Sequence, residues 1–525
     1  MEQVKLYDTT LRDGMGGQGM SLSVGEKLKV VRALDRLGIQ FIEAGFPSSN
    51  PKEAELFELL AEEKLEQATI CAFGMTRRAG VAAAEDPALE TLTSSFAPVV
   101  CLVGKSWKLH LEKVIRVPVE ENLAMIRDSV AFCGGKGKRP VFDAEHFFDG
   151  YRDDPGFALE CVRAAADAGA ENVTLCDTNG GSLPDFIGEA TGAVVAALGD
   201  DVEIGIHTHN DAECAVANSL AAVAAGARLV QGTVNGYGER CGNANLASIL
   251  PALQLKMGFD VVPKESLANL TPTAHYLDEL CNMTPNPDQA YVGRNAFAHK
   301  AGMHAAGVAT DARTFEHLDP AEVGNERDIL PSELSGKATI RTQAEQAGLE
   351  IDDAATGRAL ERLKELEHRG YHYEAAQASF ELLLRRESGS YEPLFELESF
   401  RVTTEKHADG KVETEATVKV KVGEEHYAEV AKGNGPVNAL DSALRAAIAD
   451  RYPHLADIEL TNYKVRILDE SHGTGAITRV LLDSSDHERE WGTIGVSENI
   501  IEASWEALVD SLEYAFQPRM ENDAG

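Results

Sequence analysis

The sequence predicts an α/β protein with an N-terminal (β/α)8 barrel, helical linker subdomains and a C-terminal α+β domain of two βββα modules. Three observations lead to this prediction. Eight short β-rich runs alternate with helical patterns over about the first 258 residues, polar side chains follow strand after strand, and the pattern changes near residue 391. We expect a catalytic barrel over residues 1–265, linker subdomains over 266–390 and a regulatory domain over 391–525.

The alternating part of the chain contains eight units of a strand followed by a helix. The expected strands are Val4–Thr9, Phe41–Ala44, Thr69–Phe73, Val99–Val103, Pro140–Asp143, Val173–Cys176, Glu203–His207 and Arg228–Val234. Apolar residues at helical spacing predict helices at Lys27–Leu37, Glu53–Leu60, Arg77–Ala84, Asn122–Phe132, Phe157–Ala168, Phe186–Leu198, Ala215–Ala225 and Leu246–Met257. The third of these helices has the weakest pattern. Eight such units match the usual size of a (β/α)8 barrel, although a doubly wound open sheet shows the same alternation.

Polar, reactive residues gather where the expected strands end. They are Arg12-Asp13, Glu43, Glu145-His146, Asp177 to Asn179, His207 to Asp211, and Asn235 to Asn243. In a barrel these strand ends meet at one mouth, where active sites lie, whereas the outer strands of an open sheet diverge. We therefore favour the barrel and expect the functional site at its mouth.

The second half of the chain has two kinds of pattern. Residues 259–390 are mostly helical with Pro and Gly breaks, and one long helix is expected at Ala354–Arg369. From about residue 391 three strands and a helix occur twice. The strands are expected near 395–404, 411–422, 426–431, 458–468, 476–483 and 491–496, and the helices at Pro436–Asp450 and Asn499–Tyr514. This tail lacks the dense clusters of acid, base and metal-binding residues that follow the barrel strands, which indicates a binding or assembly domain.

Composition argues against several classes of partner. Lys and Arg total 49 and Asp and Glu total 85, a net charge of −36. Such a surface repels phosphate backbones and anionic lipid, so we expect no nucleic-acid or membrane role. No apolar stretch approaches the roughly 18 residues of a membrane span, the N-terminus has no signal-peptide pattern, and no two of the eight cysteines form a CxxC pair. We expect a cytoplasmic protein with reduced thiols, and charge alone does not distinguish a saline habitat from ordinary solubility.

A metal site is the first chemical prediction. His207 and His209 stand two apart at a strand end, so both imidazoles face the same side. Asp13 follows the first strand, which closes against the eighth, and Asn243 on the loop after the eighth strand offers a carbonyl oxygen. Two imidazoles with oxygen ligands suit Mg²⁺, Mn²⁺, Zn²⁺ or Fe²⁺. The structural alternative is that these polar residues only fix a turn.

Five further residues are candidates for catalysis or substrate binding. Arg12 next to Asp13 either forms only a structural ion pair with Glu43, or is held rigid by it to face a developing negative charge. Thr178 either binds a substrate carboxylate or completes a turn. Glu145 and His304 are candidate bases, and a lone histidine is more often structural than catalytic.

Four segments of the barrel resemble the DRE-TIM metallolyase superfamily, which includes 2-isopropylmalate, homocitrate and citramalate synthases and hydroxymethylglutaryl-CoA lyases. They are Tyr7–Gly14, Phe41–Gly45, His207–Asp211 and Asn235–Asn243. The name-giving Asp, Arg and Glu of the superfamily match Asp13, Arg12 and Glu43. Within its α-isopropylmalate and homocitrate synthase family, the segments most similar to the long type of citramalate synthase are Phe142–Gly150, Phe297–His304 and Val323–Arg327.

This resemblance implies an acyltransferase that condenses acetyl-CoA with pyruvate to give (R)-citramalate, in isoleucine biosynthesis. Asp13, His207 and His209 would bind the divalent metal, Mg²⁺ or Mn²⁺ with Zn²⁺ as an alternative, and Asn243 would lie in or next to the ligand shell. The duplicated tail is similar to the allosteric domain of these synthases, which implies feedback inhibition by isoleucine and a homodimer.

The resemblance also implies roles for the remaining candidates. Pyruvate would bind the metal through its ketone and one carboxylate oxygen, with Thr178, Arg12 and Glu145 around it. Arg12, held by Glu43, would stabilise the alkoxide formed on attack. Glu145 and His304 would serve in proton abstraction and thioester hydrolysis.

Two departures from the family pattern keep other functions open. Gly16 stands where the family has a glutamine, with Gln18 two residues later, and Phe315 replaces a tyrosine. Neither residue belongs to the expected metal shell. The alternatives are a 2-isopropylmalate or homocitrate synthase, which differ in the keto acid, and a metabolite-sensing protein with a decayed barrel.

Overall fold

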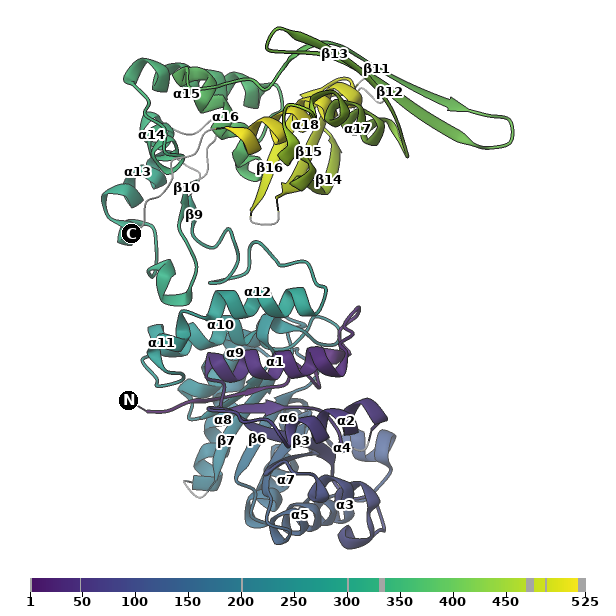
Figure 1. The fold of residues 1–525 in the computed structure, drawn as a ribbon. Coiled ribbons are helices and arrows are strands. Elements are labelled where there is room, and N and C mark those ends of the chain that lie inside the picture. Colours follow the sequence, from purple (N-terminus) through teal and green to yellow (C-terminus); the bar gives the residue numbers. More distant parts are fainter. Residues whose placement is uncertain are drawn as a thin grey trace. The chain divides into compact units, whose positions relative to one another are not determined.

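The computed structural model describes residues 2–47, 49–199, 202–299, 302–329, 336–468, 476–486 and 489–517. The chain forms two compact units, which Figure 1 shows coloured along the sequence. The first comprises residues 1–297 and 318–327, and the second comprises residues 298–317 and 328–525. The domain boundaries expected at residues 265 and 390 stay predictions.

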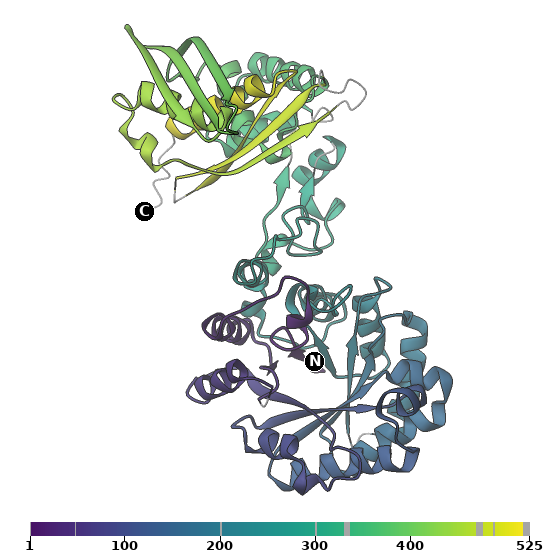
Figure 2. The same cartoon turned by 90° about the vertical axis from the view of Figure 1, so that its right-hand side faces the viewer.

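The first unit is a closed barrel of eight parallel strands with its helices outside (Figures 1 and 2). The strands are β1 (Lys5–Asp8), β2 (Phe41–Glu43), β3 (Thr69–Met75), β4 (Val99–Lys105), β5 (Arg139–Glu145), β6 (Asn172–Asp177), β7 (Glu203–Thr208) and β8 (Leu229–Gly232). The first strand pairs with the last, Tyr7 opposite Gln231, and this closure excludes an open sheet. The predicted barrel is therefore confirmed.

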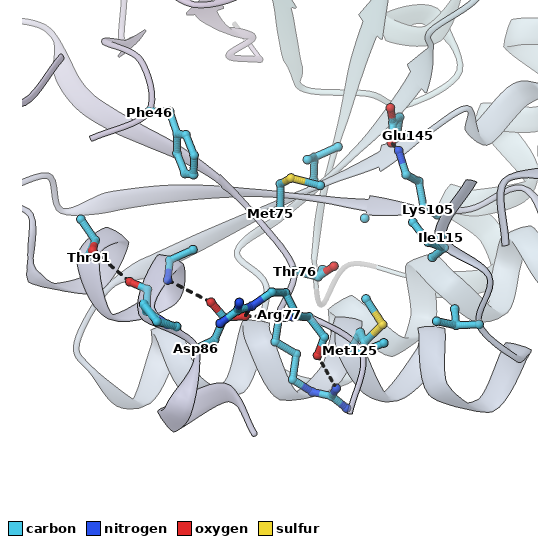
Figure 3. Close-up of a pocket in the computed structure, with 17 residues that line it drawn as sticks. Phe46, Met75, Thr76, Arg77, Asp86, Thr91, Lys105, Ile115, Met125 and Glu145 are labelled. Carbon is cyan, nitrogen blue, oxygen red and sulfur yellow. Dashed lines mark hydrogen bonds and ion pairs between the residues drawn. The ribbon is translucent and has the colours of Figure 1, made fainter. Parts of the chain in front are cut away.

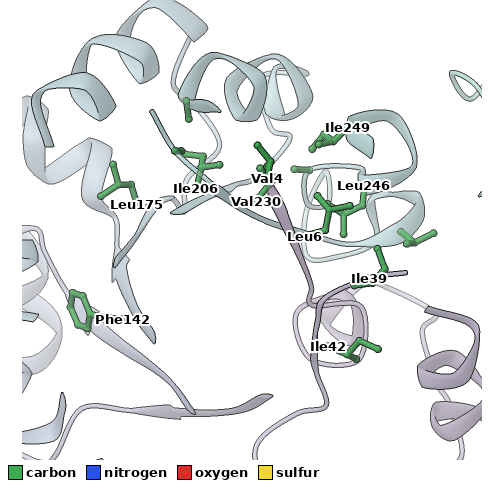
Figure 4. Packing of buried hydrophobic residues seen from close by; sticks show 14 of the residues in the cluster. Val4, Leu6, Ile39, Ile42, Phe142, Leu175, Ile206, Val230, Leu246 and Ile249 are labelled. Carbon is green, nitrogen blue, oxygen red and sulfur yellow. The ribbon is translucent and has the colours of Figure 1, made fainter. Parts of the chain in front are cut away.

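Successive side chains of each strand point to opposite faces of the barrel wall. Outward residues such as Leu6 on β1 and Val230 on β8 belong to the main core, together with Leu246 on the surrounding helix α10 (Figure 4). A smaller apolar cluster lies on the inward face, and its buried members are Tyr7, Cys71, Val99, Cys101, Val141 and Leu229. Polar side chains share this inward face, and they connect the barrel interior to the candidate site.

Some helices of the barrel unit begin at capping residues. Ser23 and Glu26 form a capping box at α1, and Asp154 caps α7 ahead of Pro155. The helices are α1 (Val24–Leu37), α2 (Pro51–Leu60), α3 (Pro87–Ser94), α4 (Lys108–His110), α5 (Val119–Gly135), α6 (Phe147–Asp153), α7 (Pro155–Asp167), α8 (Pro184–Leu198), α9 (Ala215–Ala224), α10 (Leu246–Pro251), α11 (Lys264–Leu267) and α12 (Leu270–Leu280).

The helix predicted at Arg77–Ala84 is wrong. Its first residue is instead held by polar contacts, because the Arg77 side chain pairs with Glu121 and Asp128. The helix that follows β3 is α3, whose first turn is capped when Asp86 Oδ1 accepts the Ala88 N–H. An aspartate followed by proline is a stronger start signal than the weak apolar pattern upstream.

The second unit carries a helical part and the duplicated module. The helical part contains β9 (Ala298–His299), α13 (Gly302–Thr310), β10 (Asp328–Ile329), α14 (Lys337–Gln346), α15 (Asp353–His368) and α16 (Gln377–Ser388). The first module has β11 (Glu396–Lys406), β12 (Val412–Val422), β13 (Glu425–Gly433) and α17 (Pro436–Ile448), and the second has β14 (Glu459–Ile467), β15 (Thr478–Ser485), β16 (Glu490–Ser497) and α18 (Ile500–Phe516). Each set of three strands forms an antiparallel sheet, as the two predicted βββα modules require.

All eight cysteines are free thiols, and six of them are buried. Cys214 is half-buried and Cys241 is exposed. Within the described part of the chain, no helix combines the length and the apolar character that crossing a membrane requires.

Candidate metal centre and active site

Two histidines and one aspartate meet at the carboxyl ends of the barrel strands. His207 lies in β7, His209 directly follows it, and Asp13 lies on the loop after β1. Asp13 Oδ2 is 3.2 Å from Nε2 of His207 and 3.7 Å from Nε2 of His209, and the two Nε2 atoms are 3.3 Å apart. Both histidines are buried. The structure therefore brings the three predicted ligands to one point.

Asn243 lies next to this cluster, because its backbone forms an isolated bridge with His209. Its Nδ2 donates to the carbonyl oxygen of Tyr237 over 3.0 Å, while its buried Oδ1 has no hydrogen-bond partner among the described residues. Gly238 makes this packing possible, since a Cβ there would lie 2.2 Å from Asn243 Nδ2 and its φ is +149°. The free carbonyl oxygen fits a further metal ligand.

The charges around the cluster favour the ligand forms of Asp13 and His209. For His207, burial lowers the pKa, but the hydrogen bond and the charge of Asp13 outweigh burial and raise it. Burial raises the pKa of Asp13, but Arg12 and the imidazoles outweigh burial and hold this pKa well below its usual range. Burial, aided by the charge of His207, lowers the pKa of His209 to about 4, so this imidazole is neutral at pH 7. Metal binding requires an ionised carboxylate and a neutral imidazole.

The residues present fit a divalent cation. The ligand atoms of Asp13, His207 and His209 all lie within 4.8 Å of one another, and the buried Oδ1 of Asn243 has no other use. A mixed nitrogen and oxygen set of this kind suits Mg²⁺, Mn²⁺, Zn²⁺ or Fe²⁺.

Arg12 is held from three sides at the mouth of the barrel. Its Nε pairs with Glu43 Oε2 over 2.5 Å, its Nη1 lies 3.3 Å from Asp13, and its guanidinium stacks 4.1 Å from the centre of the Phe73 ring. Glu43 is fully buried at the end of β2 and also accepts the hydroxyl proton of Tyr7. The guanidinium is thus fixed beside the metal ligands with 22% of its side chain exposed.

Glu145 ends β5 beside an apolar pocket of about 620 Å³. Its carboxylate pairs with Lys105 at the end of β4, and Figure 3 shows the two side chains together at one side of the pocket. Phe46, Met75 and Met125 contribute apolar walls. The pocket leaves space for a reacting molecule beside the Glu145 carboxylate, and the Lys105 ammonium group lies close to it.

The Thr178 hydroxyl lies on the loop after β6, next to His146, which directly follows β5. Thr178 Oγ1 accepts the backbone N–H of His146 over 2.9 Å, which leaves its hydroxyl proton free to donate. Its carbonyl oxygen accepts from Arg240, whose guanidinium also pairs with Asp211. These bonds connect the loops after β5, β6, β7 and β8. They fix the position of Thr178, the predicted carboxylate-binding residue.

His304 lies in α13 of the second unit, where it is exposed and its ring stacks on Phe315 with centroids 4.3 Å apart. The two units are described separately, so the assignment of His304 to the active site stays a prediction. Residues 300–301 of the motif around it lie outside the described residues.

Sequence reasoning missed two polar residues inside the barrel. Gln231 on β8 and Asp143 on β5 are both buried, and Gln231 Nε2 donates to Asp143 Oδ1 over 2.8 Å. Gln231 Oε1 lies 3.0 Å from His207 Nδ1. The available signal was a glutamine at an inward position of an otherwise apolar strand.

Comparison with known families and proteins agrees with this geometry. A model described as HMGL-like matches residues 3–275, one described as homocitrate synthase post-HMGL domain-like matches 291–371, and one described as LeuA allosteric (dimerisation) domain matches 374–516. The chain is 49% identical to the (R)-citramalate synthase of Synechocystis over 98% of its own length and 96% of the relative's. It is 48% identical to that of Geobacter sulfurreducens over 98% of both chains.

A relative named for a different activity is less similar in sequence. The probable 2-isopropylmalate synthase of Methanopyrus kandleri is 34% identical over 97% of both chains. The predicted resemblance is confirmed, and the chain belongs to the HMGL-like family and, within it, to the family of the (R)-citramalate synthases.

Proposed function

We propose that this chain is a metal-dependent citramalate synthase that condenses acetyl-CoA with pyruvate. A base removes a proton from the acetyl methyl group, and the resulting carbanion forms a carbon–carbon bond to C2 of pyruvate. The C2 oxygen takes up a proton, and water then cleaves the thioester to release (R)-citramalate and CoA. The observation that carries this proposal is the convergence of Asp13, His207 and His209 at the mouth of a closed barrel.

A divalent cation held by these residues supplies Lewis-acid polarisation of the keto group. Arg12, fixed by Glu43, faces the oxygen on which negative charge develops. Thr178 offers its free hydroxyl proton to the pyruvate carboxylate, since its oxygen already accepts from His146.

Glu145 is the proposed base for the acetyl methyl group, with His304 as its partner in the later hydrolysis. The apolar pocket beside Glu145 has room for the acyl end of acetyl-CoA. A carboxylate within reach of the acetyl methyl group can act as the general base. Val103→Phe, which fills part of this pocket, should raise the KM for acetyl-CoA several-fold and leave metal binding unchanged.

The activity is tested by metal-dependent release of free CoA thiol with pyruvate, 2-oxoisovalerate and 2-oxoglutarate, each with Mn²⁺. We expect thiol release with pyruvate above the rate without keto acid, and chiral chromatography should identify (R)-citramalate. His207→Ala is the matched control, because it removes one ligand and keeps the rest of the barrel.

Two results would contradict the assignment. A preference for 2-oxoisovalerate would make the chain a 2-isopropylmalate synthase, and one for 2-oxoglutarate a homocitrate synthase. Thiol release with none of the keto acids would favour the sensor with a decayed barrel, which the departures at Gly16 and Phe315 motivate.

We further propose that the two βββα modules bind isoleucine and join two copies of the chain. The allosteric and dimerisation model that matches residues 374–516 supports this, as do the two repeated sheets. Truncation at residue 390 is a poor test, because α16 packs against α18 and Ser379 accepts the Ile494 N–H. Isoleucine should instead be titrated against the full chain, with leucine and valine as controls.

Isoleucine should lower the rate and slow hydrogen exchange in β11–β16, and equal effects of the three amino acids would contradict a specific isoleucine site. Light scattering should give about twice the 56.5 kDa chain mass, and a mass of one chain would contradict the dimer. We also propose a cytoplasmic location, which the eight free thiols support.

A further inference from the structure

A column of buried polar side chains runs through the barrel interior behind the metal centre. Gln231 lies opposite His207 in the register between β8 and β7, so both side chains point into the barrel. Gln231, Thr174 and Asn172 are buried in this column, as are His207 and Asp143. Burying polar side chains costs more free energy than burying apolar ones, so the polar column needs a functional explanation.

Gln231 uses all three bonding functions of its amide. Its Nε2 donates to Asp143 Oδ1 over 2.8 Å and to Thr174 Oγ1 over 3.3 Å. Its Oε1 lies 3.0 Å from His207 Nδ1. Thr174 is an acceptor here because its own hydroxyl donates to Asn172 Oδ1 over 2.8 Å.

These contacts fix the orientation of the amide. Turning it over would place Oε1 2.8 Å from the Asp143 oxygen and also against the accepting oxygen of Thr174. Both contacts would then join two acceptors, which is repulsive. The amide oxygen therefore faces His207.

A carbonyl oxygen only accepts, so His207 Nδ1 must carry the proton. The lone pair of the neutral ring is then on Nε2, the nitrogen that faces Asp13 and His209. An acceptor placed behind a metal-binding imidazole in this way orients the ring and sets its tautomer.

The same column continues away from the metal centre. Asn172 Nδ2 donates to Glu203 Oε1 over 3.3 Å, and the other oxygen of Glu203 pairs with Lys5 over 2.9 Å. The chain of donors and acceptors is thus anchored by an ion pair at the start of β1 and β7. Each bond in it fixes the direction of the next.

We propose that Gln231 is a positioning residue that, oriented by Asp143 and Thr174, holds His207 in the tautomer able to bind a divalent metal. This inference rests on the proposed metal centre. It assigns a role to two residues, Gln231 and Asp143, that make no contact with substrate in the proposed reaction.

The test replaces Gln231 by methionine in the full chain and measures Co²⁺ binding by its visible absorption. Q231M keeps the length of the side chain and removes the acceptor, so the affinity for Co²⁺ should fall about 10- to 100-fold. The absorption band of bound Co²⁺ should also change, which a purely structural role would not cause. Gln40→Met is the matched control.

Gln40 suits this purpose because its amide also makes three hydrogen bonds, with Leu6, Gly38 and Val261. It has no link to His207, so Q40M should bind Co²⁺ like the wild type. The comparison separates loss of a hydrogen-bonded amide from loss of the acceptor that faces His207.

A swapped pair provides a second test. Asp143→Asn alone replaces a carboxylate that only accepts by an amide that also donates, so Gln231 is no longer held in one orientation and Co²⁺ binding should weaken. Adding Gln231→Glu restores the pattern, because the amide introduced at position 143 can donate to the carboxylate introduced at position 231, which accepts from His207. The double variant should recover most of the affinity, and this comparison stands even where Q231M does not fold.

The outcomes are distinct. Wild-type affinity in Q231M, or a double variant as weak as Asp143→Asn alone, overturns the inference and leaves the metal centre intact. Absence of Co²⁺ binding to the wild-type protein overturns the metal centre and the inference with it.

Discussion

Replacing Glu43 by glutamine removes the charge that holds Arg12 at the barrel mouth. Glu43 is fully buried, and its two oxygens are used by Arg12 and by the hydroxyl of Tyr7. Glutamine has nearly the same shape, so the change deletes a charge and little volume. It leaves a guanidinium with 22% of its side chain exposed and with Asp13 as its remaining ion-pair partner among the described residues.

The expected cost follows from this burial. Removing one partner of a buried ion pair destabilises a protein by about 3–5 kcal/mol when the other charge is left without compensation. Asp13 still faces Arg12, so we expect at most this cost. For the barrel unit of residues 1–297 and 318–327, it corresponds to a fall of at most about 5–8 °C in the melting temperature. The guanidinium is also released from its fixed position, and loss of one preorganised group of this kind lowers kcat about 100- to 1,000-fold.

Calorimetry measures the first effect and CoA-thiol release measures the second. The barrel transition is identified as the one that Mn²⁺ shifts, since the metal ligands lie in that unit. Two control variants carry the same chemical change. Glu53→Gln breaks another buried pair, with Lys27 on α1, and Glu63→Gln breaks a pair with Arg32, whose side chain is 48% exposed.

The three variants should differ in a defined way. E53Q should lose about as much stability as E43Q and keep its kcat, whereas E63Q should lose far less stability, because its partner Arg32 is exposed to solvent. If E43Q melts at the same temperature as E63Q, burial does not make the Glu43–Arg12 pair important for stability, and the prediction is refuted. It is equally refuted if E53Q loses as much activity as E43Q, because the effect of Glu43 would then be one of stability alone.

Three other predictions concern the same mouth. Mn²⁺ at 100 times its Kd should stabilise the barrel by about 2.7 kcal/mol, and His207→Ala or a chelator should abolish this shift in calorimetry. Gly238→Ala should displace Asn243 and reduce both Mn²⁺ affinity and turnover, whereas Gly19→Ala, where a Cβ meets nothing within 4 Å, should keep both. Glu145→Gln should lower kcat about 100- to 10,000-fold with unchanged Mn²⁺ binding, and wild-type turnover in that variant would exclude Glu145 as the base.

The sequence was sufficient for the barrel and for the metal cluster because both depend on simple periodicity. Residues two apart at a strand end face one way, so His207 and His209 could be paired without coordinates. Closure of the first strand on the eighth then placed Asp13 beside them. The sheet topology and the 3.2 Å contact between Asp13 and His207 follow from these two rules.

Other features depend on contacts that no local pattern reveals. The segment from Arg77 is held by side chains of α5, so its apolar spacing misled the helix prediction. Gln231 looked like an isolated polar residue in an apolar strand, and its meaning depends on Asp143, 88 residues away. A hydrogen-bond network between distant strands is invisible to periodicity, which describes one element at a time.

Gly16 shows how a departure from the family pattern can be read once the neighbours are known. A Cβ at this position would lie 2.8 Å from Cγ of Glu239, on the loop after β8. A glutamine there would require Glu239 to move, so glycine is the residue that this loop packing accepts. The glycine therefore allows the loop after β1 to pack closely against the loop after β8.

The polar interior argues against a decayed barrel in the same physical terms. Asn243 Oδ1 and His209 Nδ1 are buried and have no partner in the described part of the chain, and a buried unpaired polar atom costs about 1–3 kcal/mol. Asp13, Arg12 and Glu43 add charges that an apolar core would not need. Such costs are uncompensated in a purely structural barrel, whereas a divalent cation would use the free Asn243 oxygen and the Asp13 charge together. A bound cation would therefore account for these buried charges and unpaired atoms, which are unfavourable in its absence.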